Sequence, residues 1–391
     1  MSIKRLIKKS ILEAKAYKPP INRKDYIRLD LNENYAVLND NILRKLKDFD
    51  KFTISSYPEY QELIPLVAKY AGVSNDFISL VNGSDHAIQL LIDLFFEKGD
   101  AVVIPSPIFF VYHHFLNIKQ ALIKNILYIE ENGKYKFPFE ETLKSLNSNV
   151  NPVRSAHGAL NPVCANSFLS IHPRGKTAEY SASNGVKGLI LCNPNNPLGI
   201  SIPEHELKEL LRKTNELDIP IIVDEAYFEY SKVNATKYLP EYENLIILRT
   251  LSKAFGLSGL RLGYVIARPE IISELEKLRL VWSVNHFAVH AGITVLSEIN
   301  YFKEKIQEQN KIKEMLYDLL CFKGIQCYKT DTNFLVCKHP NYLDVISRLN
   351  KNKILVNDVS HYPYSGNILK NAFRINVPSE EDFNLLKNLD F

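Results

Sequence analysis

LIILRTLSKAFGLSGLRLG occupies residues 245–263 of this 391-residue chain. Its apolar run, 245–248, ends at a turn of small and hydroxyl-bearing residues around one lysine, Lys253. A short apolar run bounded by turn residues is typical of a strand buried on both faces of a sheet. Four more runs of this kind occur along the chain, at 77–81, 101–104, 187–192 and 220–223.

Helical patterns separate these runs, for example at 61–71, 86–96 and 202–215. Strands that alternate with helices predict an α/β fold with a large, mostly parallel sheet. A long helical pattern at 271–320 then leads into alternating segments that indicate a smaller α+β domain, at 334–337, 354–356 and 373–377. We expect three parts: an N-terminal arm that joins the small domain (1–45), the large domain (46–275) and the small C-terminal domain (276–391).

Residues 148–185 have a different composition from the rest of the chain. Ala, Ser, Asn, Pro and Gly make up 22 of these 38 residues, and the segment has neither a helical nor a strand period. A structureless loop this long is unusual inside a compact domain. We interpret it as a surface insertion between a helix ending near residue 146 and the strand that begins at 187, in preference to an active-site lid.

Composition narrows the class of protein. The net charge of +4 is small and scattered, which argues against nucleic acid as a partner. Five cysteines without a Cys-x-x-Cys pair indicate free thiols and predict no metal site. The N-terminus lacks the apolar core of a signal peptide, and no apolar run approaches the roughly 20 residues of a membrane span. We therefore expect a cytoplasmic protein with no membrane contact.

Lys253 alone would be an ordinary surface lysine, but its neighbours suggest otherwise. Thr250, Ser252 and Arg261 place two hydroxyls and a cation beside it. This combination suits a bound phosphate monoester, because an arginine can grip two of its oxygens at once.

Two further polar motifs directly follow apolar strands. VDEAY (223–227) places Asp224 where it could face a ring nitrogen, and we expect Glu225 to cap the following helix. CNPNNPLG (192–199) is a rigid Pro-rich turn that can also hold Asn196 as a hydrogen-bond donor. Ligands collect at the carboxyl ends of parallel strands, so both motifs are candidates for one site.

The segment 81–91, VNGSDHAIQLL, runs from a strand through a glycine into a helix. Free N–H groups at a helix N-terminus form an anion site, and glycine permits close approach. Taken alone, this signal is weak. The aromatic segment 107–112, PIFFVY, suits either core packing or ring stacking, and these residues alone do not decide between the two.

The constellation resembles the fold-type I aminotransferases that use pyridoxal 5′-phosphate (PLP), and among them the histidinol-phosphate aminotransferase branch. The motifs that carry the resemblance are LDLNEN (29–34), SYPEY (56–60), NGSDHAI (82–88), NPNNPLG (193–199), DEAY (224–227), TLSKAFGLSGLRLG (250–263) and FRIN (373–376). They cover nearly the whole chain outside the insertion. The resemblance implies a seven-stranded type of large sheet and a small domain beside it.

The resemblance also implies roles toward the cofactor. Lys253 would bond covalently to PLP and act as acid and base, and Asp224 would pair with the pyridine nitrogen. Asn196 and Tyr227 would bond the ring's 3′-oxygen, and Phe109 would stack on the ring. The phosphate would be held by Ser84, Asp85, Thr250, Ser252 and Arg261, and by Tyr57 from a neighbouring subunit. A homodimer is therefore implied.

On the substrate side, the resemblance implies that Arg374 binds a carboxylate and that Tyr17 and Asn333 line the pocket. Asn357 stands where the branch usually carries an arginine that helps to bind histidinol phosphate. The expected activity is amino transfer between an amine or amino acid and 2-oxoglutarate, with histidinol phosphate as the first candidate. The alternatives are a class I/II aminotransferase with another substrate and a decarboxylase of the threonine-phosphate type. A binding module that has lost catalysis is disfavoured because Lys253 and Asp224 are both present.

Overall fold

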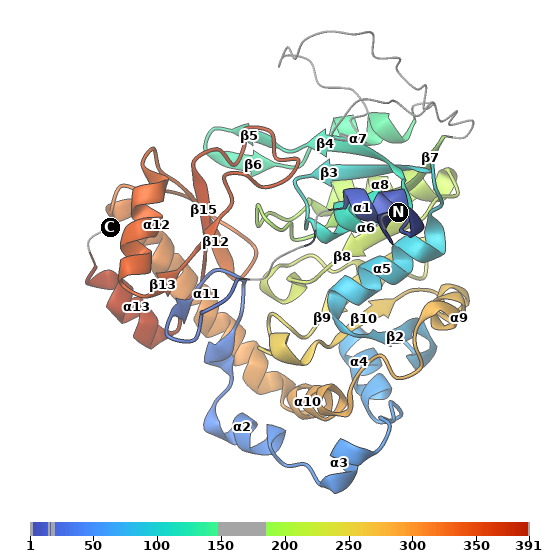
Figure 1. Cartoon of the computed structure of the whole chain (residues 1–391), viewed down its shortest axis with the longest axis horizontal. Coiled ribbons are helices and arrows are strands. Elements are labelled where there is room, and N and C mark those ends of the chain that lie inside the picture. Colours follow the sequence, from blue (N-terminus) through green and yellow to red (C-terminus); the bar gives the residue numbers. More distant parts are fainter. Residues whose placement is uncertain (1–2, 15, 17–19, 148–184, 390–391) are drawn as a thin grey trace.

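The computed structural model describes residues 3–14, 16, 20–147 and 185–389. The expected insertion therefore lies outside the described residues, except for Gly185. Figure 1 shows a large sheet beside a smaller α+β unit that contains the C-terminal helices. The large sheet has seven strands in the order β2-β10-β9-β8-β7-β3-β4. Their bounds are β2 Ile78–Val81, β3 Ala101–Ser106, β4 Leu122–Leu127, β7 Val186–Cys192, β8 Ile221–Asp224, β9 Leu245–Thr250 and β10 Gly263–Ile266.

The predicted α/β fold with a mostly parallel sheet is confirmed. Strands β4, β3, β7, β8 and β9 pair in parallel, whereas β10 runs antiparallel to both β9 and β2. All five apolar runs are strands, but two strands escaped prediction. β4 has two polar residues, Lys124 and Asn125, in its middle, and β10 is only four residues long and begins at a glycine, so neither forms a conspicuous apolar run.

Helices cover both faces of this sheet, which explains the continuous apolar runs in strands such as β8 and β9. One core cluster holds Ile246 and Leu248 of β9 with residues of α5, α6 and α9, and the other holds Leu245 and Ile247 with residues of α4, α7, α8 and α10. Alternate residues of one strand thus face opposite layers. The helices are α1 Lys9–Glu13, α2 Asp40–Leu46, α3 Lys51–Ser55, α4 Leu63–Ala71, α5 Gly83–Phe95, α6 Val111–Lys119, α7 Phe139–Leu146, α8 Glu204–Glu216, α9 Pro269–Leu278, α10 His286–Ser297, α11 Ile299–Phe322, α12 Tyr342–Lys351 and α13 Glu380–Lys387.

The helical pattern at 271–320 is not one helix. It comprises α9, α10 and α11, and the backbone leaves the helical conformation after Leu278. A new helix, α10, begins after Asn285, which caps it: the Asn285 side chain accepts a hydrogen bond from the N–H of Ala288 (2.9 Å). Among the helices that the structure describes, none is long and apolar enough to cross a membrane.

The smaller unit is built on a four-stranded antiparallel sheet in the order β11-β12-β15-β14. Its strands are β11 Gln326–Tyr328, β12 Phe334–Lys338, β14 Asn357–Asp358 and β15 Ala372–Asn376. The N-terminal segment joins this unit through β1 (Ile27–Arg28), which pairs in parallel with β13 (Ile354–Leu355). A separate hairpin consists of β5 (Ile129–Glu131) and β6 (Lys134–Lys136). The domain boundaries at 45 and 275 stay a prediction, and α10, which lies after 275, packs on α2, α3 and α4.

Candidate active site

Polar side chains meet at the carboxyl edge of the large sheet. Cys192 of β7, Asp224 of β8 and Leu248 of β9 lie side by side in register, so the residues that follow them emerge together. Ligands bind at this edge in open α/β sheets because the chain leaves each strand there in a loop. The edge therefore gathers three of the segments singled out in the sequence, those of Asn196, Asp224 and Lys253.

Asp224 is a buried carboxylate, and its side chain is only 3% exposed. Its Oδ2 accepts a hydrogen bond from the hydroxyl of Tyr112 (3.0 Å), and its Oδ1 accepts one from the N–H of Ala226 (3.1 Å). Burial raises the pKa of Asp224 to about 6, and these two hydrogen bonds oppose the rise. A cationic group placed against this carboxylate would favour its charged form.

Lys253 lies in the turn after β9, and its amine donates to the backbone carbonyl of Leu31 (3.3 Å). Burial, together with the charges of Arg374 and Arg261, lowers the pKa of this amine to about 8, although the charge of Asp85 opposes the change. A large fraction of the amine is therefore neutral near pH 8, and a neutral amine is the form that attacks an aldehyde. The lysine singled out in the sequence is a candidate nucleophile.

An anion site lies where β2 passes into α5. The first N–H groups of a helix have no partner within the helix, and the N-cap residue, Asn82, makes no side-chain cap here. Arg261, with a left-handed φ of +57°, brings its guanidinium to this end and donates to Oδ2 of Asp85 (2.9 Å). A Cβ on Gly83 would lie 2.4 Å from Nη2 of Arg261, so any side chain at this position would displace the guanidinium.

Two hydroxyls border the same region. Thr250 Oγ1 donates to the carbonyl of Leu262 (3.1 Å) and lies 2.9 Å from Oγ of Ser252. The N–H of Ser252 in turn donates to Thr250 Oγ1 (3.1 Å). Gly263 of β10 allows a close approach, because a Cβ there would come within 3.1 Å of the backbone N of Ser84. Hydroxyls, a guanidinium and helix N–H groups together suit a phosphate.

Tyr227 is fully buried, and its ring lies 5.9 Å from the Lys253 amine. Its hydroxyl oxygen accepts a hydrogen bond from Nδ2 of Asn32 (2.7 Å), and this bond does not use the hydroxyl proton. Burial raises the pKa of Tyr227 well above its usual value, and the Arg374 charge opposes this rise. Tyr227 is therefore a neutral hydrogen-bond donor beside the lysine.

Arg374 of β15 reaches from the small sheet to the large one. Its Nη1 donates to Oδ1 of Asn196 (2.6 Å), and its Nη2 donates to the carbonyl of Asp30 (3.1 Å). Asn196 therefore keeps its amide nitrogen as the donor for a ligand. Asn357 lies opposite Arg374 in the β14–β15 register, and its Nδ2 donates to the same Asp30 carbonyl (3.2 Å). The oxygens of Asn196 and Asp30 that Arg374 contacts are neutral, and a carboxylate could replace them.

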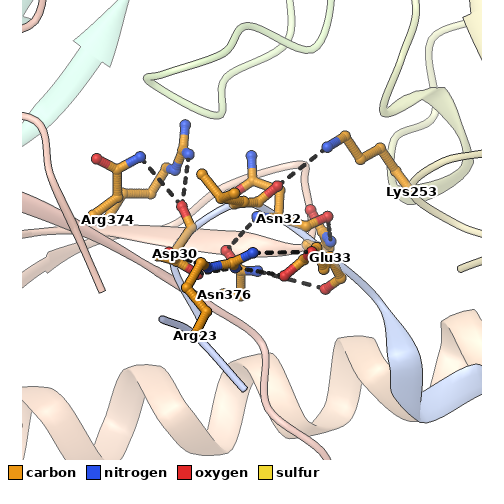
Figure 2. A network of polar contacts seen from close by, with 10 residues as sticks. Arg23, Asp30, Asn32, Glu33, Lys253, Arg374 and Asn376 are labelled. Carbon is orange, nitrogen blue, oxygen red and sulfur yellow. Dashed lines mark hydrogen bonds and ion pairs between the residues drawn. The ribbon is translucent and has the colours of Figure 1, made fainter. Parts of the chain in front are cut away.

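The segment 30–33 crosses this site and connects its parts, as Figure 2 shows. Asn32 has a φ of +57°, a left-handed conformation that asparagine tolerates better than most residues. The fully buried Asn376 holds the segment from below, because its Oδ1 accepts from the N–H of Asn32 (3.0 Å). On the other side, Arg23 forms ion pairs with Asp30 and Glu33.

The remaining predicted residues are more scattered. Asn333 is buried and donates to the carbonyl of Asn32 (3.2 Å), which places it at the segment that crosses the site. Phe109 is partly buried and packs edge-on against Phe110, with the ring centroids 5.2 Å apart. Tyr57 is 70% exposed and stacks on Trp282, 4.0 Å between ring centroids. Tyr17 lies outside the described residues.

Glu225 does not cap a helix that follows directly, as the sequence suggested. It is fully buried, and its Oε2 accepts two hydrogen bonds from Arg249 (2.9 and 2.7 Å). Its Oε1 accepts from the N–H of Ala235 (2.7 Å), at the start of a short 3₁₀ turn ten residues later. The correction has a simple cause: the chain after Glu225 forms turns instead of a regular helix, so the carboxylate bonds to more distant groups.

Sequence reasoning missed four contributors: Arg23, Asn32, Tyr112 and Asn376. Three of them lie inside quoted segments, LDLNEN, PIFFVY and FRIN, so the motifs were noticed but the residues were not assigned. Asn32 and Asn376 left only a weak signal, because each is a polar residue that directly follows an apolar one, Leu31 or Ile375. Arg23 had no such signal.

Fold and site together define a class: an α/β protein whose sheet edge gathers a buried amine, a buried carboxylate and an anion site, the groups that suit a phosphorylated aldehyde cofactor. The family model of aminotransferase class I and II matches residues 24–388, so the chain belongs to this family. It is similar to the histidinol-phosphate aminotransferase of Caldanaerobacter subterraneus subsp. tengcongensis, with 30% identity over 92% of this chain and 91% of that one. The enzyme of that name from Methanocaldococcus jannaschii is 29% identical over 96% of this chain and 90% of its own length.

Solved structures agree on the fold. Histidinol-phosphate aminotransferase from Sinorhizobium meliloti, in complex with PLP, has a TM-score of 0.72 at 20% identity and covers 92% of this chain and 88% of its own. The enzyme of that name from Clostridium acetobutylicum has a TM-score of 0.72 at 21% identity, over 92% and 97%. The chain is thus a PLP-dependent transaminase of fold type I.

The site's geometry fits this cofactor. The cradle beside Gly83, which a Cβ would fill, places the Arg261 guanidinium at the start of α5, where a phosphate can bind. The neutral-prone amine of Lys253 and the buried carboxylate of Asp224 suit the aldehyde and the ring nitrogen, respectively. The phosphate, the aldehyde and the ring nitrogen of PLP would thus each meet a suitable group at this edge of the sheet.

Proposed function

We propose that the chain transfers the amino group of histidinol phosphate to 2-oxoglutarate. One observation carries the proposal: curated relatives of this name match the chain over more than nine-tenths of both lengths. The substrate comes from those relatives, while the residues below supply the chemistry. When bound, PLP supplies a cationic ring that accepts the electron pair released at the substrate's Cα.

The proposal assigns each residue one task toward this chemistry. Lys253 takes the proton from the substrate's Cα and returns it, because its lowered pKa makes the amine a usable base. Asp224 holds the ring nitrogen protonated, and Asn196 and Tyr227 donate to the ring oxygen. The phosphate is held by Arg261, Thr250, Ser252 and the backbone N–H groups of Ser84 and Asp85. Phe109 covers one face of the ring.

Arg374 is the proposed anchor for a carboxylate of glutamate or 2-oxoglutarate, since histidinol phosphate itself carries none. It is 5% exposed, and its guanidinium contacts two neutral oxygens, those of Asn196 and Asp30. A carboxylate that displaces the Asp30 carbonyl would form a charge-assisted pair in a dry site, and such pairs are about twice as strong as neutral ones. Asn333, at the same segment, and Tyr17 complete the proposed substrate wall.

Asn357 supports a second candidate, a transaminase for another amino donor. Its neutral amide is committed to the Asp30 carbonyl (3.2 Å) and lies next to Arg374 in the sheet. A neutral amide attracts a phosphate dianion much less than an arginine does. The two candidates therefore differ in one property, which is how strongly the site prefers a phosphorylated amine.

A panel of amino donors tests both candidates. Purified enzyme with PLP and 2-oxoglutarate should form glutamate fastest with histidinol phosphate, at least tenfold faster than with histidinol. Equal rates would refute the first candidate and favour the second, and release of carbon dioxide from a phosphorylated amino acid would indicate a decarboxylase.

Arg374→Ala should raise the KM for glutamate and leave the PLP affinity unchanged. Unchanged glutamate turnover in this variant would contradict the carboxylate assignment.

We also propose that the enzyme is a homodimer in which Tyr57 reaches the partner's PLP phosphate. Its neighbourhood supports this, because large apolar side chains gather on the surface around α3 and the loop before α10. The most exposed are Phe52 (58%), Ile54 (69%), Leu280 (74%) and Val281 (65%). Light scattering should give twice the 44.9 kDa mass of the chain. A monomer with full activity would refute the dimer and the role of Tyr57.

The proposed compartment is the cytoplasm. Cys192, Cys321, Cys327 and Cys337, the four cysteines that the structure describes, are free thiols. Free thiols persist in a reducing compartment. Fractionation of cells that express the chain would test the location.

A further inference from the structure

The segment Asp30–Glu33 makes an unusual number of contacts with the active site through its backbone. Its three consecutive carbonyls, of residues 30, 31 and 32, accept hydrogen bonds from four side chains: Arg374, Asn357, Lys253 and Asn333. The side chain of Asn32 adds a fifth contact, to the Tyr227 hydroxyl (2.7 Å). The shape of this short stretch of backbone therefore sets the positions of both the lysine and the carboxylate anchor.

Arg23 forms ion pairs with this segment on the side away from Lys253, as Figure 2 shows. It meets Asp30 with two nitrogens, Nε to Oδ2 (3.1 Å) and Nη2 to Oδ1 (2.5 Å). It also meets Glu33 with two nitrogens, Nη1 to Oε1 (3.3 Å) and Nη2 to Oε2 (2.6 Å). The three side chains are 13%, 10% and 22% exposed, so water screens these contacts little. Only a planar, forked cation can bridge two carboxylates in this way.

We propose that Arg23 is a positioning residue of the active site. It holds the Asp30–Glu33 segment in the backbone conformation in which its carbonyls accept hydrogen bonds from Lys253 and Arg374. The inference rests on the proposed function and deepens it, since it concerns the same site. Arg23 acts on the site through the segment, whose carbonyls accept hydrogen bonds from Lys253 and Arg374. Its role is to join residues 30 and 33 across the left-handed turn at Asn32.

Charge explains why the segment depends on this arginine. Asp30 and Glu33 point to the same side, and without Arg23 two poorly solvated carboxylates would repel each other. The segment would then open, and the carbonyls of residues 30 and 31 would leave Arg374 and Lys253. Asn376 holds only the backbone N–H of Asn32 (3.0 Å) and, more weakly, the carbonyl of Glu33 (3.5 Å), so it cannot replace the side-chain bridge.

The test compares Arg23→Ala with Arg212→Ala in the PLP-loaded enzyme. Arg212 is the matched control, because it also pairs with two carboxylates, Glu209 and Glu216, but on the exposed face of α8. Arg23→Ala should lower kcat for the half-reaction with glutamate at least tenfold and raise its KM, with the PLP dissociation constant changed less than twofold. Arg212→Ala should leave all three values unchanged.

Hydrogen–deuterium exchange gives a readout independent of turnover. Peptides that cover 27–34 should exchange faster in Arg23→Ala, while peptides that cover 250–263 keep the wild-type rate. Arg23→Lys should recover activity only in part, because a single ammonium keeps the charge but loses the fork. Wild-type kinetics together with unchanged exchange at 27–34 would overturn the proposal, as would full recovery in Arg23→Lys.

Two features keep the result interpretable. If Arg23→Ala folds poorly, Glu33→Gln can be measured in its place, because it removes one carboxylate charge from the bridge. This variant should change kinetics and exchange in the same direction but less. Wild-type behaviour of Glu33→Gln would also count against the proposal. The glutamate half-reaction, followed by the absorbance of bound PLP, does not involve histidinol phosphate. A failure of the proposed substrate and a failure of the Arg23 role are therefore separate results.

Discussion

Replacing Gly83 by alanine should weaken PLP binding about ten- to a hundredfold. The new Cβ would lie 2.4 Å from Nη2 and 2.9 Å from Cζ of Arg261, so the guanidinium must move away from the start of α5. A hydrogen bond to a charged group contributes roughly 1.5–3 kcal/mol. Since about 1.4 kcal/mol corresponds to a factor of ten, loss of the Arg261 contact to the phosphate gives this range.

The substitution also strains the backbone, because Gly83 has a φ of +76°. An alanine with positive φ costs about 1 kcal/mol of stability, whatever surrounds it. Gly72 is the matched control: its φ is +74°, and nothing lies within 4 Å of the position of its Cβ. Gly72→Ala and Gly83→Ala should therefore lose comparable stability, and only Gly83→Ala should lose affinity for PLP.

The assay titrates PLP into cofactor-free protein and follows the visible absorbance of the bound cofactor, with Tm measured on the same samples. The reasoning would be refuted if Gly83→Ala bound PLP within twofold of the wild type. Equal weakening in Gly72→Ala would also refute it, because the effect would then come from strain and not from displacement of Arg261.

Three further predictions concern charge. Burial lowers the pKa of Lys253 to about 8. The rate at which PLP attaches to cofactor-free protein should therefore rise with pH and level off above about pH 8. A rate that levels off only near pH 10 would contradict the lowered pKa. Burial raises the pKa of Asp224 to about 6, so cofactor-free protein should lose stability as pH rises from about 4 to 6. Asp224→Asn should then be more stable than the wild type at pH 8, on the order of 1–2 kcal/mol, and no gain in urea titrations would count against this. Arg249→Ala removes the cationic partner of the buried Glu225 and should lower the free energy of unfolding, measured with denaturant, by about 3–5 kcal/mol. The exposed control Arg212→Ala should lower it by less than about 1 kcal/mol.

Much of the large domain was predictable from local sequence. Strands such as β8 and β9 are covered by helices on both faces, so residues 221–223 and 245–248 are all apolar and these runs stand out. Asp224 was identifiable for the same reason, because a polar residue directly after such a run emerges at the sheet edge. Lys253 was found from its neighbours, whose hydroxyls and arginine lie within a few positions along the chain.

Other features depend on residues that are distant in the sequence. Asn32 meets Tyr227 across 195 positions, and Arg374 meets the Asp30 carbonyl across 344. The antiparallel direction of β10 and the break after Leu278 also follow from how neighbouring elements pack. Glu225 shows the same limit, because its partner Arg249 belongs to the next strand of the sheet.

By itself, the sequence determined the layered α/β architecture, the lysine and aspartate at the strand ends and the resemblance to PLP-dependent aminotransferases. Periodicity, strand ends and short motifs are local properties, which a linear sequence displays directly. The tertiary structure alone decided how Arg23, Asn32 and Asn376 shape the pocket and what Asn357 contacts. Those roles arise from the meeting of the N-terminal segment, the small sheet and the large sheet, and no local pattern records which distant segments will meet.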